Sequence, residues 1–293
     1  MSTEPQRVAF LGLGTMGAPM AANLARAGIE VIAFNRTGAR AEELAGRHAN
    51  VTLAATPAEA AAAAGVAISM VPDIAEVEQV LLGPDGAAEG LDAGDLAIDM
   101  STIAPSASRS IAQRLGERGI EFLDAPVTGS RPKAEDATLT IMAGGREAAF
   151  DRAQPLFEAI GELVLHAGPQ GHGSMVKLIN NTLAAVNAAA LAEGLVLAQG
   201  AGLDAGKALE VIAAGSGESA MRRLKAEPML SGDYEPLFKL GHMLKDVRHC
   251  LAEAGALGVE LPLAASAEQL YAAAEGRGLG GRDFAAVIEA LRP

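Results

Sequence analysis

Cysteine, tryptophan and an excess of positive charge are what this chain lacks. Cys250 is the only cysteine among 293 residues. A single cysteine excludes an internal disulfide framework and is typical of a reducing compartment, so we expect a cytoplasmic protein and interpret Cys250 as a small buried residue. Tryptophan is absent and aromatic residues make up only 3% of the chain. Ala and Leu therefore have to build the interior, which favours packed helices.

The formal net charge is −13, which argues against a nucleic-acid partner because such a partner needs a basic surface. A small anionic substrate remains compatible, since the local charge of a site decides its binding. The polar residues 1–7 contain no apolar core of a signal peptide. Glu, Asn or Gly interrupts the longest alanine-rich stretches, so we expect no membrane span.

Strand-like and helix-like stretches alternate through the first half of the chain. This alternation predicts an α/β fold with a Rossmann-type, doubly wound parallel sheet. Strands are predicted at residues 7–12, 29–35, 50–53, 66–71, 95–100, 120–127, 138–143 and 162–166. Helices are predicted at 39–48, 57–64, 74–82, 105–118 and 147–160. Thr56 is expected to cap the helix that begins at Pro57.

The pattern changes to helices alone after Gly173. Residues 174–200 read as one helix of roughly 40 Å, and its apolar character predicts burial on nearly every face. We predict a dinucleotide-binding domain over residues 1–168. An all-helical domain for substrate binding and oligomerisation is predicted over residues 169–293, and a cleft between two domains is the usual place for a substrate.

A glycine-rich turn follows the first predicted strand and precedes a helix-like stretch. Its glycines have G-x-G-x-x-G-like spacing, and strand, turn and helix in this order predict a dinucleotide site. Gly12 would allow the tight turn, Gly14 the approach of backbone to a pyrophosphate, and Gly17 the packing of helix on strand. The phosphates are expected at the helix N-terminus. The predicted cofactor-binding loop consists of Gly12, Leu13, Gly14, Thr15, Met16 and Gly17.

The second predicted strand ends at Asn35, Arg36 and Thr37, which we predict as further cofactor contacts. An acidic side chain here would bind the ribose of NAD, but Asn35 is uncharged. Arg36 can pair with a 2′-phosphate, and such a charged hydrogen bond contributes roughly 1.5–3 kcal/mol, or about one to two decades of preference. NADP(H) is therefore predicted over NAD(H), whose use stays open. The alternative is that Arg36 is a solvated loop residue.

Lys177 and Asn181 lie four residues apart and share one face of the long predicted helix. A lysine in an apolar helix either extends its charge to the surface or serves a site. Gly171 and Gly173 permit close approach of another segment or a ligand. Reduction of a carbonyl by hydride leaves an oxygen that needs a proton, which a lysine can donate. We predict Lys177 as the general acid/base and Asn181 as the residue that holds the oxygen or orients the lysine.

Two loops at the ends of predicted strands are further candidates. The loop 124–130 ends in Thr128, Gly129 and Ser130, whose N–H and hydroxyl groups can bind a carboxylate. An ordinary turn is the alternative. Residues 99–102 end the preceding strand, and the carboxyl ends of strands face the ligand crevice of an open sheet.

The pair Lys245 and Asp246 is the last candidate. His242, Asp246 and His249 have a helical spacing that metal ligands can adopt. A solvated helix face is the better interpretation, so we predict no metal site.

Taken together, the motifs resemble the β-hydroxyacid dehydrogenase family, which includes 3-hydroxyisobutyrate dehydrogenase, tartronate semialdehyde reductase and the glyoxylate/succinic semialdehyde reductases. The resemblance covers most of the chain and rests on residues 12–20, 99–102, 124–127, 171–181, 245–246 and 283–284. It implies a Rossmann-type domain joined by a long interdomain helix to an all-helical domain, and a homodimer or homotetramer.

By this resemblance, Lys177 matches the catalytic lysine of the family and Asn181 its substrate-side partner. Thr128, Gly129 and Ser130 match the loop that binds the substrate carboxylate, although that loop commonly reads Ser-Gly-Gly. The matching cofactor contacts are Val71, Pro72, Thr102, Lys245 and Asp246, of which Lys245 also reaches the active site.

We therefore predict an NADPH-linked oxidoreductase acting on a short β-hydroxy acid or semialdehyde. The substrate would be of the 3-hydroxyisobutyrate, tartronate semialdehyde, glyoxylate or succinic semialdehyde type. Residues 35–37 and 131–136 look most like the glyoxylate/succinic semialdehyde reductases. Two alternatives stay open. One is an imine reductase, although imine reductases generally replace the lysine. The other is a non-catalytic NADP-binding module, although relatives of that kind have lost the lysine.

Overall fold

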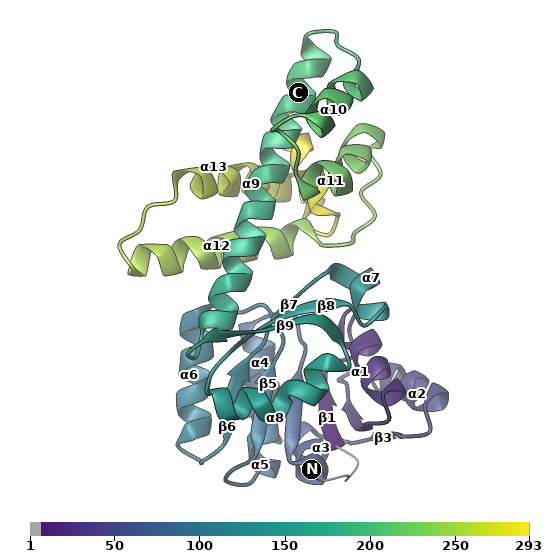
Figure 1. The fold of residues 1–293 in the computed structure, drawn as a ribbon, viewed down its shortest axis with the longest axis vertical. Helices are drawn as coiled ribbons and strands as arrows, with labels where there is room; N and C mark the ends of the chain where they lie inside the picture. Colours follow the sequence, from purple (N-terminus) through teal and green to yellow (C-terminus); the bar gives the residue numbers. More distant parts are fainter. Residues whose placement is uncertain (1–6, 293) are drawn as a thin grey trace. The chain divides into compact units, whose positions relative to one another are not determined.

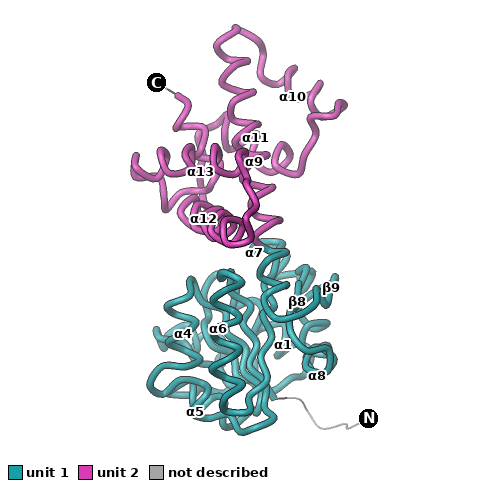
Figure 2. Tube along the Cα trace, turned by 90° about the vertical axis from the view of Figure 1, so that its left-hand side faces the viewer, with its two compact units in different colours: residues 1–177 teal, residues 178–293 magenta. Residues whose placement is uncertain are grey.

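The chain forms two compact units. The computed structural model describes residues 7–292, so most of the polar N-terminal stretch lies outside the described residues. Contacts between Cα atoms define unit 1 as residues 1–177 and unit 2 as residues 178–293 (Figure 2). The division falls inside the long helix α9 (His172–Gly200). The sequence-based boundary between residues 168 and 169 stays a prediction.

Unit 1 contains one sheet, in which β1 to β6 are parallel, as the sequence predicts. The strands that the structure describes are β1 (Arg7–Leu11), β2 (Glu30–Phe34), β3 (Val51–Leu53), β4 (Val66–Ser69), β5 (Leu96–Asp99), β6 (Glu121–Asp124), β7 (Val127–Thr128), β8 (Leu139–Gly144) and β9 (Gly161–Gly168). Their order is β3-β2-β1-β4-β5-β6-β8-β7, and β9 pairs with β8. The predicted strand 120–127 is divided into β6 and β7. Pro126, which has no N–H to donate to a ladder, lies at the interruption.

Helices cover both faces of this sheet (Figure 1). They are α1 (Gly17–Arg26), α2 (Gly38–Arg47), α3 (Pro57–Ala64), α4 (Ile74–Leu82), α5 (Ala87–Gly90), α6 (Pro105–Gly116), α7 (Ser130–Glu135) and α8 (Glu147–Glu158). Successive strand residues point to opposite faces. Phe10 therefore belongs to the core with α1, α2 and α8, and Leu11 to the core with α3, α4 and α6. The predicted cap is confirmed, because Thr56 Oγ1 accepts a hydrogen bond from Glu59 N at 3.0 Å.

Unit 2 is all-helical over its described residues. After α9 come α10 (Ala205–Ala214), α11 (Ala220–Ser231), α12 (Leu240–Ala256), α13 (Pro262–Ala274), the π-helical turn η1 (Glu275–Leu279) and the 3₁₀ helix η2 (Phe284–Ala290). The prediction that α9 is buried on nearly every face is wrong for the single chain. Only 39% of its most apolar stretch is buried. By length and composition alone α9 could cross a membrane, a property that long helices of soluble domains share.

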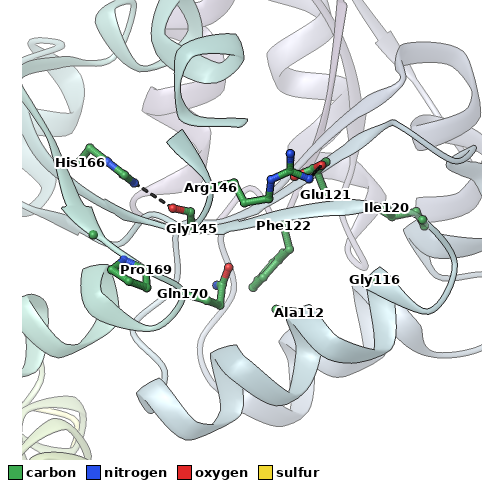
Figure 3. A pocket seen from close by; sticks show the side chains of 12 residues that line it. Ala112, Gly116, Ile120, Glu121, Phe122, Gly145, Arg146, His166, Pro169 and Gln170 are labelled. Carbon is green, nitrogen blue, oxygen red and sulfur yellow. Dashed lines mark hydrogen bonds and ion pairs between the residues drawn. The ribbon is translucent and has the colours of Figure 1, made fainter. Parts of the chain in front are cut away.

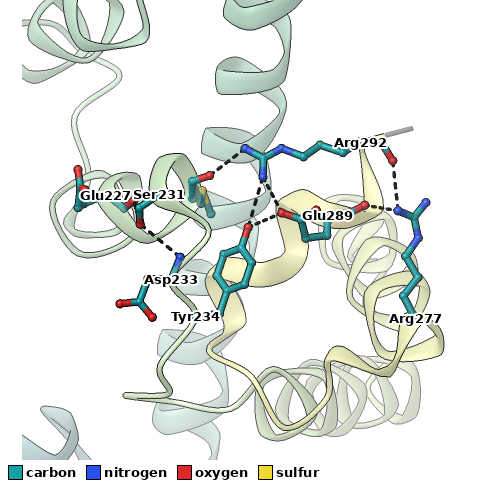
Figure 4. Close-up of polar contacts among 8 residues, drawn as sticks. Glu227, Ser231, Asp233, Tyr234, Arg277, Glu289 and Arg292 are labelled. Carbon is teal, nitrogen blue, oxygen red and sulfur yellow. Dashed lines mark hydrogen bonds and ion pairs between the residues drawn. The ribbon is translucent and has the colours of Figure 1, made fainter.

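Unit 2 contains a cluster of polar side chains that includes Tyr234, Glu289 and Arg292 (Figure 4). Tyr234 Oη donates to the carboxylate of Glu289, which also accepts from Arg292 Nη1 at 2.6 Å. Arg292 Nη2 donates to the carbonyl of Met229 in α11 at 2.9 Å. Burial and the neighbouring Glu289 raise the pKa of Tyr234 to about 12. The cluster therefore links η2 to α11, and the charges of Glu289 and Arg292 pair with each other.

Candidate active site

The glycine-rich turn has the geometry of a dinucleotide-binding turn. Gly12 has φ +103°, and a Cβ there would lie 2.5 Å from Met70 O. A Cβ on Gly17 would lie 2.0 Å from Gly12 O, so these two glycines are required by the packing of the chain itself. A Cβ on Gly14 would meet no protein atom within 4 Å. Protein packing does not demand glycine at position 14, whereas close approach of a pyrophosphate does.

The first turn of α1 suits an anion. Its described residues include no acidic side chain, and no side chain hydrogen-bonds to its cap. The N–H groups at a helix N-terminus and the helix dipole together favour a phosphate. The residues present therefore fit the pyrophosphate of a nicotinamide cofactor.

The loop after β2 is tied to the glycine-rich turn. Asn35 Oδ1 accepts from Leu13 N at 2.8 Å, and Asn35 Nδ2 donates to Thr37 O at 2.8 Å. Arg36 is exposed and makes no hydrogen bond or ion pair within residues 7–292. Arg40, which the sequence analysis missed, reaches Leu13 O with Nη1 at 3.3 Å. Its position four residues after Arg36, in the first turn of α2, was the signal that could have identified it.

The loops that follow β4 and β5 carry the predicted contacts Val71, Pro72 and Thr102. Val71 lies beside the glycine-rich turn, because a Cβ on Gly12 would be 2.8 Å from Val71 Cγ1. Val71 N donates to Ser101 Oγ at 3.0 Å, which joins the two loops. The structure thus brings Val71 to the cofactor loop. The assignment of all three residues as cofactor contacts stays a prediction.

Asp99, at the end of β5, is the buried centre of these loops. Its Oδ1 accepts from Ser69 Oγ and from Ser101 Oγ, both at 2.7 Å. Burial raises the pKa of the Asp99 carboxyl to about 6, against the hydrogen bonds from the two serines, which lower it. The charge of Asp124 on the neighbouring strand raises it further. A buried carboxyl with a raised pKa therefore joins the ends of β4 and β5, from which the predicted cofactor loops begin.

The predicted carboxylate-binding loop has an unusual backbone. Thr128 ends β7, where it pairs with Thr140 of β8. Gly129 has φ +134° and Ser130 has φ +58°. Two consecutive residues in this region are uncommon, and a serine there is strained. Such strain is frequent where a loop presents N–H groups to a ligand.

The predicted catalytic residues of α9 are both buried. Lys177 is 7% exposed and Asn181 is 5% exposed, so the charge of Lys177 does not extend into solvent. In unit 2, Asn181 Nδ2 donates to Asp246 Oδ2 at 2.7 Å, and Lys245 Nζ lies 3.6 Å from Asp246 Oδ1. The structure thus joins Asn181, Lys245 and Asp246 into one polar group. Sequence spacing could not show this, because 65 residues separate Asn181 from Asp246.

The helical spacing of His242, Asp246 and His249 does not produce a metal site in the described structure. Residues 7–292 contain no group of three or more His, Cys, Asp or Glu side chains arranged to hold a metal ion. His242 instead packs against Phe238, with ring centroids 5.9 Å apart.

A cavity of about 680 Å³ lies in unit 1 beside α6 and the ends of β6 and β9 (Figure 3). None of the predicted site residues lines it. Its wall includes Phe122, His166 and Gln170, and His166 Nε2 hydrogen-bonds to Gly145 O at 2.9 Å. This cavity is therefore separate from the cofactor loops, although Gln170 also contacts Asp124.

Comparisons with known proteins agree over both units. A family model described as the NAD binding domain of 6-phosphogluconate dehydrogenase matches residues 7–168. A second, described as NAD-binding of NADP-dependent 3-hydroxyisobutyrate dehydrogenase, matches residues 171–291. The two models together account for nearly the whole chain.

Full-length relatives extend this agreement. Glyoxylate/succinic semialdehyde reductase 2 of Arabidopsis thaliana, a chloroplastic protein, is 35% identical over 97% of this chain and 79% of its own length. The 2-hydroxy-3-oxopropionate reductase of Escherichia coli is also 35% identical, over 97% of both chains. A structure of Mycobacterium tuberculosis 3-hydroxyisobutyrate dehydrogenase with L-serine is 33% identical and has a TM-score of 0.88, covering 99% of this chain and 100% of that chain.

These relatives are reductases and dehydrogenases of small hydroxy acids and semialdehydes. They match this chain at nearly equal identity. The turn geometry and the comparisons lead to the same conclusion: the chain is an NAD(P)-dependent oxidoreductase and belongs to the β-hydroxyacid dehydrogenase family.

Proposed function

We propose that this protein reduces a short semialdehyde or 2-oxo acid with NADPH, and that Lys177 donates the proton to the new alkoxide oxygen. The burial of Lys177 on α9 carries this proposal. A lysine that is 7% exposed is held away from bulk water, and a buried lysine is often put to use in a functional site. A general acid that protonates a developing alkoxide is such a use.

The residues of the chain divide the chemistry between them. NAD(P)H supplies the hydride when bound. Lys177 Nζ donates a proton to the substrate oxygen during reduction and accepts it back during oxidation of the hydroxy acid. Asn181 has two amide hydrogens, one of which donates to Asp246. The other can donate to the substrate oxygen, because the bond to Asp246 fixes the orientation of the amide.

The strained loop at residues 128–130 is the proposed site of the substrate carboxylate. Successive N–H groups around residues of positive φ form a concave surface that binds anions. The hydroxyls of Thr128 and Ser130 add donors. A carboxylate held there would explain why the relatives act on acids, and would orient the carbonyl of the substrate for transfer.

We further propose that Arg36 and Arg40 favour NADP(H). Both guanidinium groups lie on the segment just after β2, which has no acidic side chain between residues 35 and 40. Asn35 uses its side chain to hold Leu13 and Thr37. Arg36 is then available to pair with the 2′-phosphate of NADP(H), a group that NAD(H) lacks.

A second copy of the chain is the proposed partner, as a homodimer or homotetramer. The end of α9, the connection that follows it and helix α10 expose large apolar side chains, with Leu197 at 74%, Leu203 at 61% and Val211 at 73%. None of the residues of α10 is fully buried. Several large apolar side chains exposed on neighbouring segments of one unit favour an interface there.

Initial rates of NADPH and NADH oxidation test the reaction class and the cofactor. The panel is glyoxylate, succinic semialdehyde, tartronate semialdehyde and methylmalonate semialdehyde. We expect turnover with at least one of them and faster oxidation of NADPH than of NADH. Arg36→Ala should lower the ratio of kcat/KM for NADPH to that for NADH by about ten- to a hundredfold. The exposed Arg118→Ala is the matched control.

Other outcomes of these assays would assign the protein to a different functional class. Turnover of a cyclic imine without turnover of the panel would make it an imine reductase. Tight NADPH binding without any turnover would make it a binding module. A preference for NADH in the wild type would exclude the proposed role of Arg36.

A further inference from the structure

The carboxylate of Asp124 caps the N-terminal end of α9 by accepting hydrogen bonds from its backbone. It is fully buried at the end of β6. Its Oδ1 accepts from Gly171 N at 2.7 Å, and its Oδ2 accepts from Ser174 N at 2.6 Å. A helix leaves its first N–H groups without intrahelical acceptors. Gly171, which precedes the helix, has no side chain to cap them, so a residue from a distant strand performs the capping.

A third donor completes the shell around this carboxylate. Gln170 Nε2 donates to Asp124 Oδ1 at 2.8 Å and to Ser108 Oγ of α6 at 2.9 Å. Burial raises the pKa of Asp124, and the hydrogen bonds from Ser174 and Gly171 act in the opposite direction. The carboxylate therefore joins the sheet to the start of α9 through three hydrogen bonds that are charge-assisted when it is ionised, and Gln170 extends the connection to α6.

Two glycines let the start of α9 touch the sheet backbone. A Cβ on Gly173 would lie 2.2 Å from Met142 O and 2.5 Å from Asp124 O. A Cβ on Gly144 would lie 2.7 Å from Asp124 Oδ1 and 2.8 Å from Gly173 N. Asp124 and Gly144 are also the residues that pair β6 with β8. The first turn of α9 is thus held where two strands meet, without an intervening side chain that could adjust.

The position of this first turn determines the position of Lys177. Ser174 and Lys177 are three residues apart and share a helix face, and their Cα atoms lie about 4.5 Å apart along the helix axis. A displacement of about 1 Å at a reacting group can lower a rate about a hundredfold. We propose that Asp124 is the positioning residue of Lys177, acting through its hydrogen bonds to Gly171 and Ser174. This inference rests on the proposed role of Lys177.

A double-mutant cycle of Asp124→Asn and Lys177→Met tests the coupling. Asn keeps the shape of the side chain but turns an N–H donor toward one of the backbone N–H groups. With NADPH and succinic semialdehyde or glyoxylate, Asp124→Asn should lower kcat at least about tenfold and change KM by less than about threefold. In the Lys177→Met background, measured in single turnovers, the same substitution should have almost no further effect.

Two further variants separate positioning from folding. Leu156→Ala, on the buried face of α8, removes a core side chain of unit 1 and should lower the melting temperature while preserving kcat. Gln170→Ala removes one donor to Asp124 and should lower kcat in the same direction but less than Asp124→Asn. Equal losses of kcat from Asp124→Asn in both Lys177 backgrounds would overturn the proposal, as would a kcat for Asp124→Asn that matches the wild type.

A measurement that needs no turnover distinguishes this inference from the proposed function. The lysines are ¹³C-dimethylated, and the Lys177 resonance is assigned from its loss in Lys177→Met. Asp124→Asn should shift or broaden that resonance, whereas Leu156→Ala should not. If Lys177→Met retains activity but the resonance still responds, the proposed function fails and the positioning stands. An unchanged resonance refutes the positioning whatever the activity shows.

Discussion

Unit 1 and unit 2 differ in how completely one copy of the chain buries their apolar residues. In unit 1, helices cover both faces of the sheet, and Phe10, Leu11 and Ile98 have no exposed surface. In unit 2, α10 has no fully buried residue and Leu197 is 74% exposed. A single copy of the chain buries an apolar side chain only where other residues of that copy pack over it. The proposed second copy of the chain would cover the apolar surface of unit 2, although unit 1 also exposes single aliphatic residues such as Leu163.

The two units also divide the predicted site residues. Unit 1 contains the glycine-rich turn, the loop after β2 and the strained loop at residues 128–130. Unit 2 contains Asn181, Lys245 and Asp246, while Lys177 is the last residue of unit 1. Substitutions in the glycine-rich turn and in the loop after β2 should therefore act on cofactor binding, and those at Lys177 and Asn181 on turnover.

The largest effect is expected from Lys177→Met, which removes the proton donor but keeps an apolar stem of similar length. We expect kcat to fall by about 10²–10⁴-fold, the usual contribution of general acid–base catalysis. The dissociation constant for NADPH, measured by fluorescence, should stay within about threefold because the cofactor loops are untouched. The exposed Lys207→Met of α10 is the control. Normal turnover of Lys177→Met would end its assignment as the acid.

The next largest effect is expected in the pH dependence of the free energy of unfolding, to which Asp99 of unit 1 contributes. Its pKa is about 6 in the folded protein against the 3.8 that is usual for an aspartate, so the folded state binds the proton more tightly than the unfolded state. Its contribution to stability is therefore greatest below about pH 4 and is lost as the pH rises to about 6, with a magnitude on the order of 3 kcal/mol.

Urea unfolding at a series of pH values, at one protein concentration, measures this contribution. The free energy of unfolding of the wild type, minus that of Asp99→Asn, should fall between about pH 4 and pH 6 and then level off. Subtracting the variant removes the contributions of other carboxyls except the coupling to Asp124. A flat difference would show that Asp99 is not held at a raised pKa.

Most of the fold could be predicted from local patterns. The alternation of strand-like and helix-like stretches identified every described strand except β7 as a separate strand, and Thr56 followed by Pro57 identified a helix start. The division of residues 120–127 was missed because a single proline decided it. The burial of α9 was overestimated because hydropathy reports which faces avoid water, without showing whether the same copy of the chain covers them.

The candidate site could be predicted in its motifs but not in its connections. Gly12 and Gly17 were identified from spacing, and the structure shows the close contacts that require them. The bond of Asn181 to Asp246 and the capping of α9 by Asp124 join residues 65 and about 50 positions apart. Such pairs leave no periodic signal in one sequence, because only the tertiary fold brings them together.

A pair of glycine substitutions separates folding from binding within unit 1. Gly17→Ala places a Cβ 2.0 Å from Gly12 O, so the backbone must shift and both the melting temperature and NADPH affinity should fall. Gly14→Ala meets no protein atom within 4 Å. It should keep the melting temperature of the cofactor-free protein but weaken NADPH binding about tenfold or more, or at least about 1.4 kcal/mol. Unchanged NADPH affinity in Gly14→Ala would mean that the turn does not approach the pyrophosphate.

The smallest expected effect bears directly on the difference between the units. Val211 is 73% exposed on α10, and Leu163 is 57% exposed on β9 of unit 1. If a second copy covers α10, Val211→Asp places a charge in an apolar interface and should raise the dissociation constant of the oligomer about tenfold or more. Leu163→Asp, at an exposed aliphatic position in the other unit, should leave it unchanged.

Sedimentation equilibrium measures both variants and the wild type. A wild type that stays monomeric at high concentration would remove the explanation offered for the exposed face of unit 2. Co-flotation of the wild type with phospholipid vesicles would then show that a lipid surface covers it. If Leu163→Asp dissociates the oligomer and Val211→Asp does not, the interface lies on unit 1, and exposure in a single copy would not identify the surface that assembles. The proposal that the interface lies on unit 2 therefore depends on which of the two substitutions, Val211→Asp or Leu163→Asp, leaves the oligomer intact.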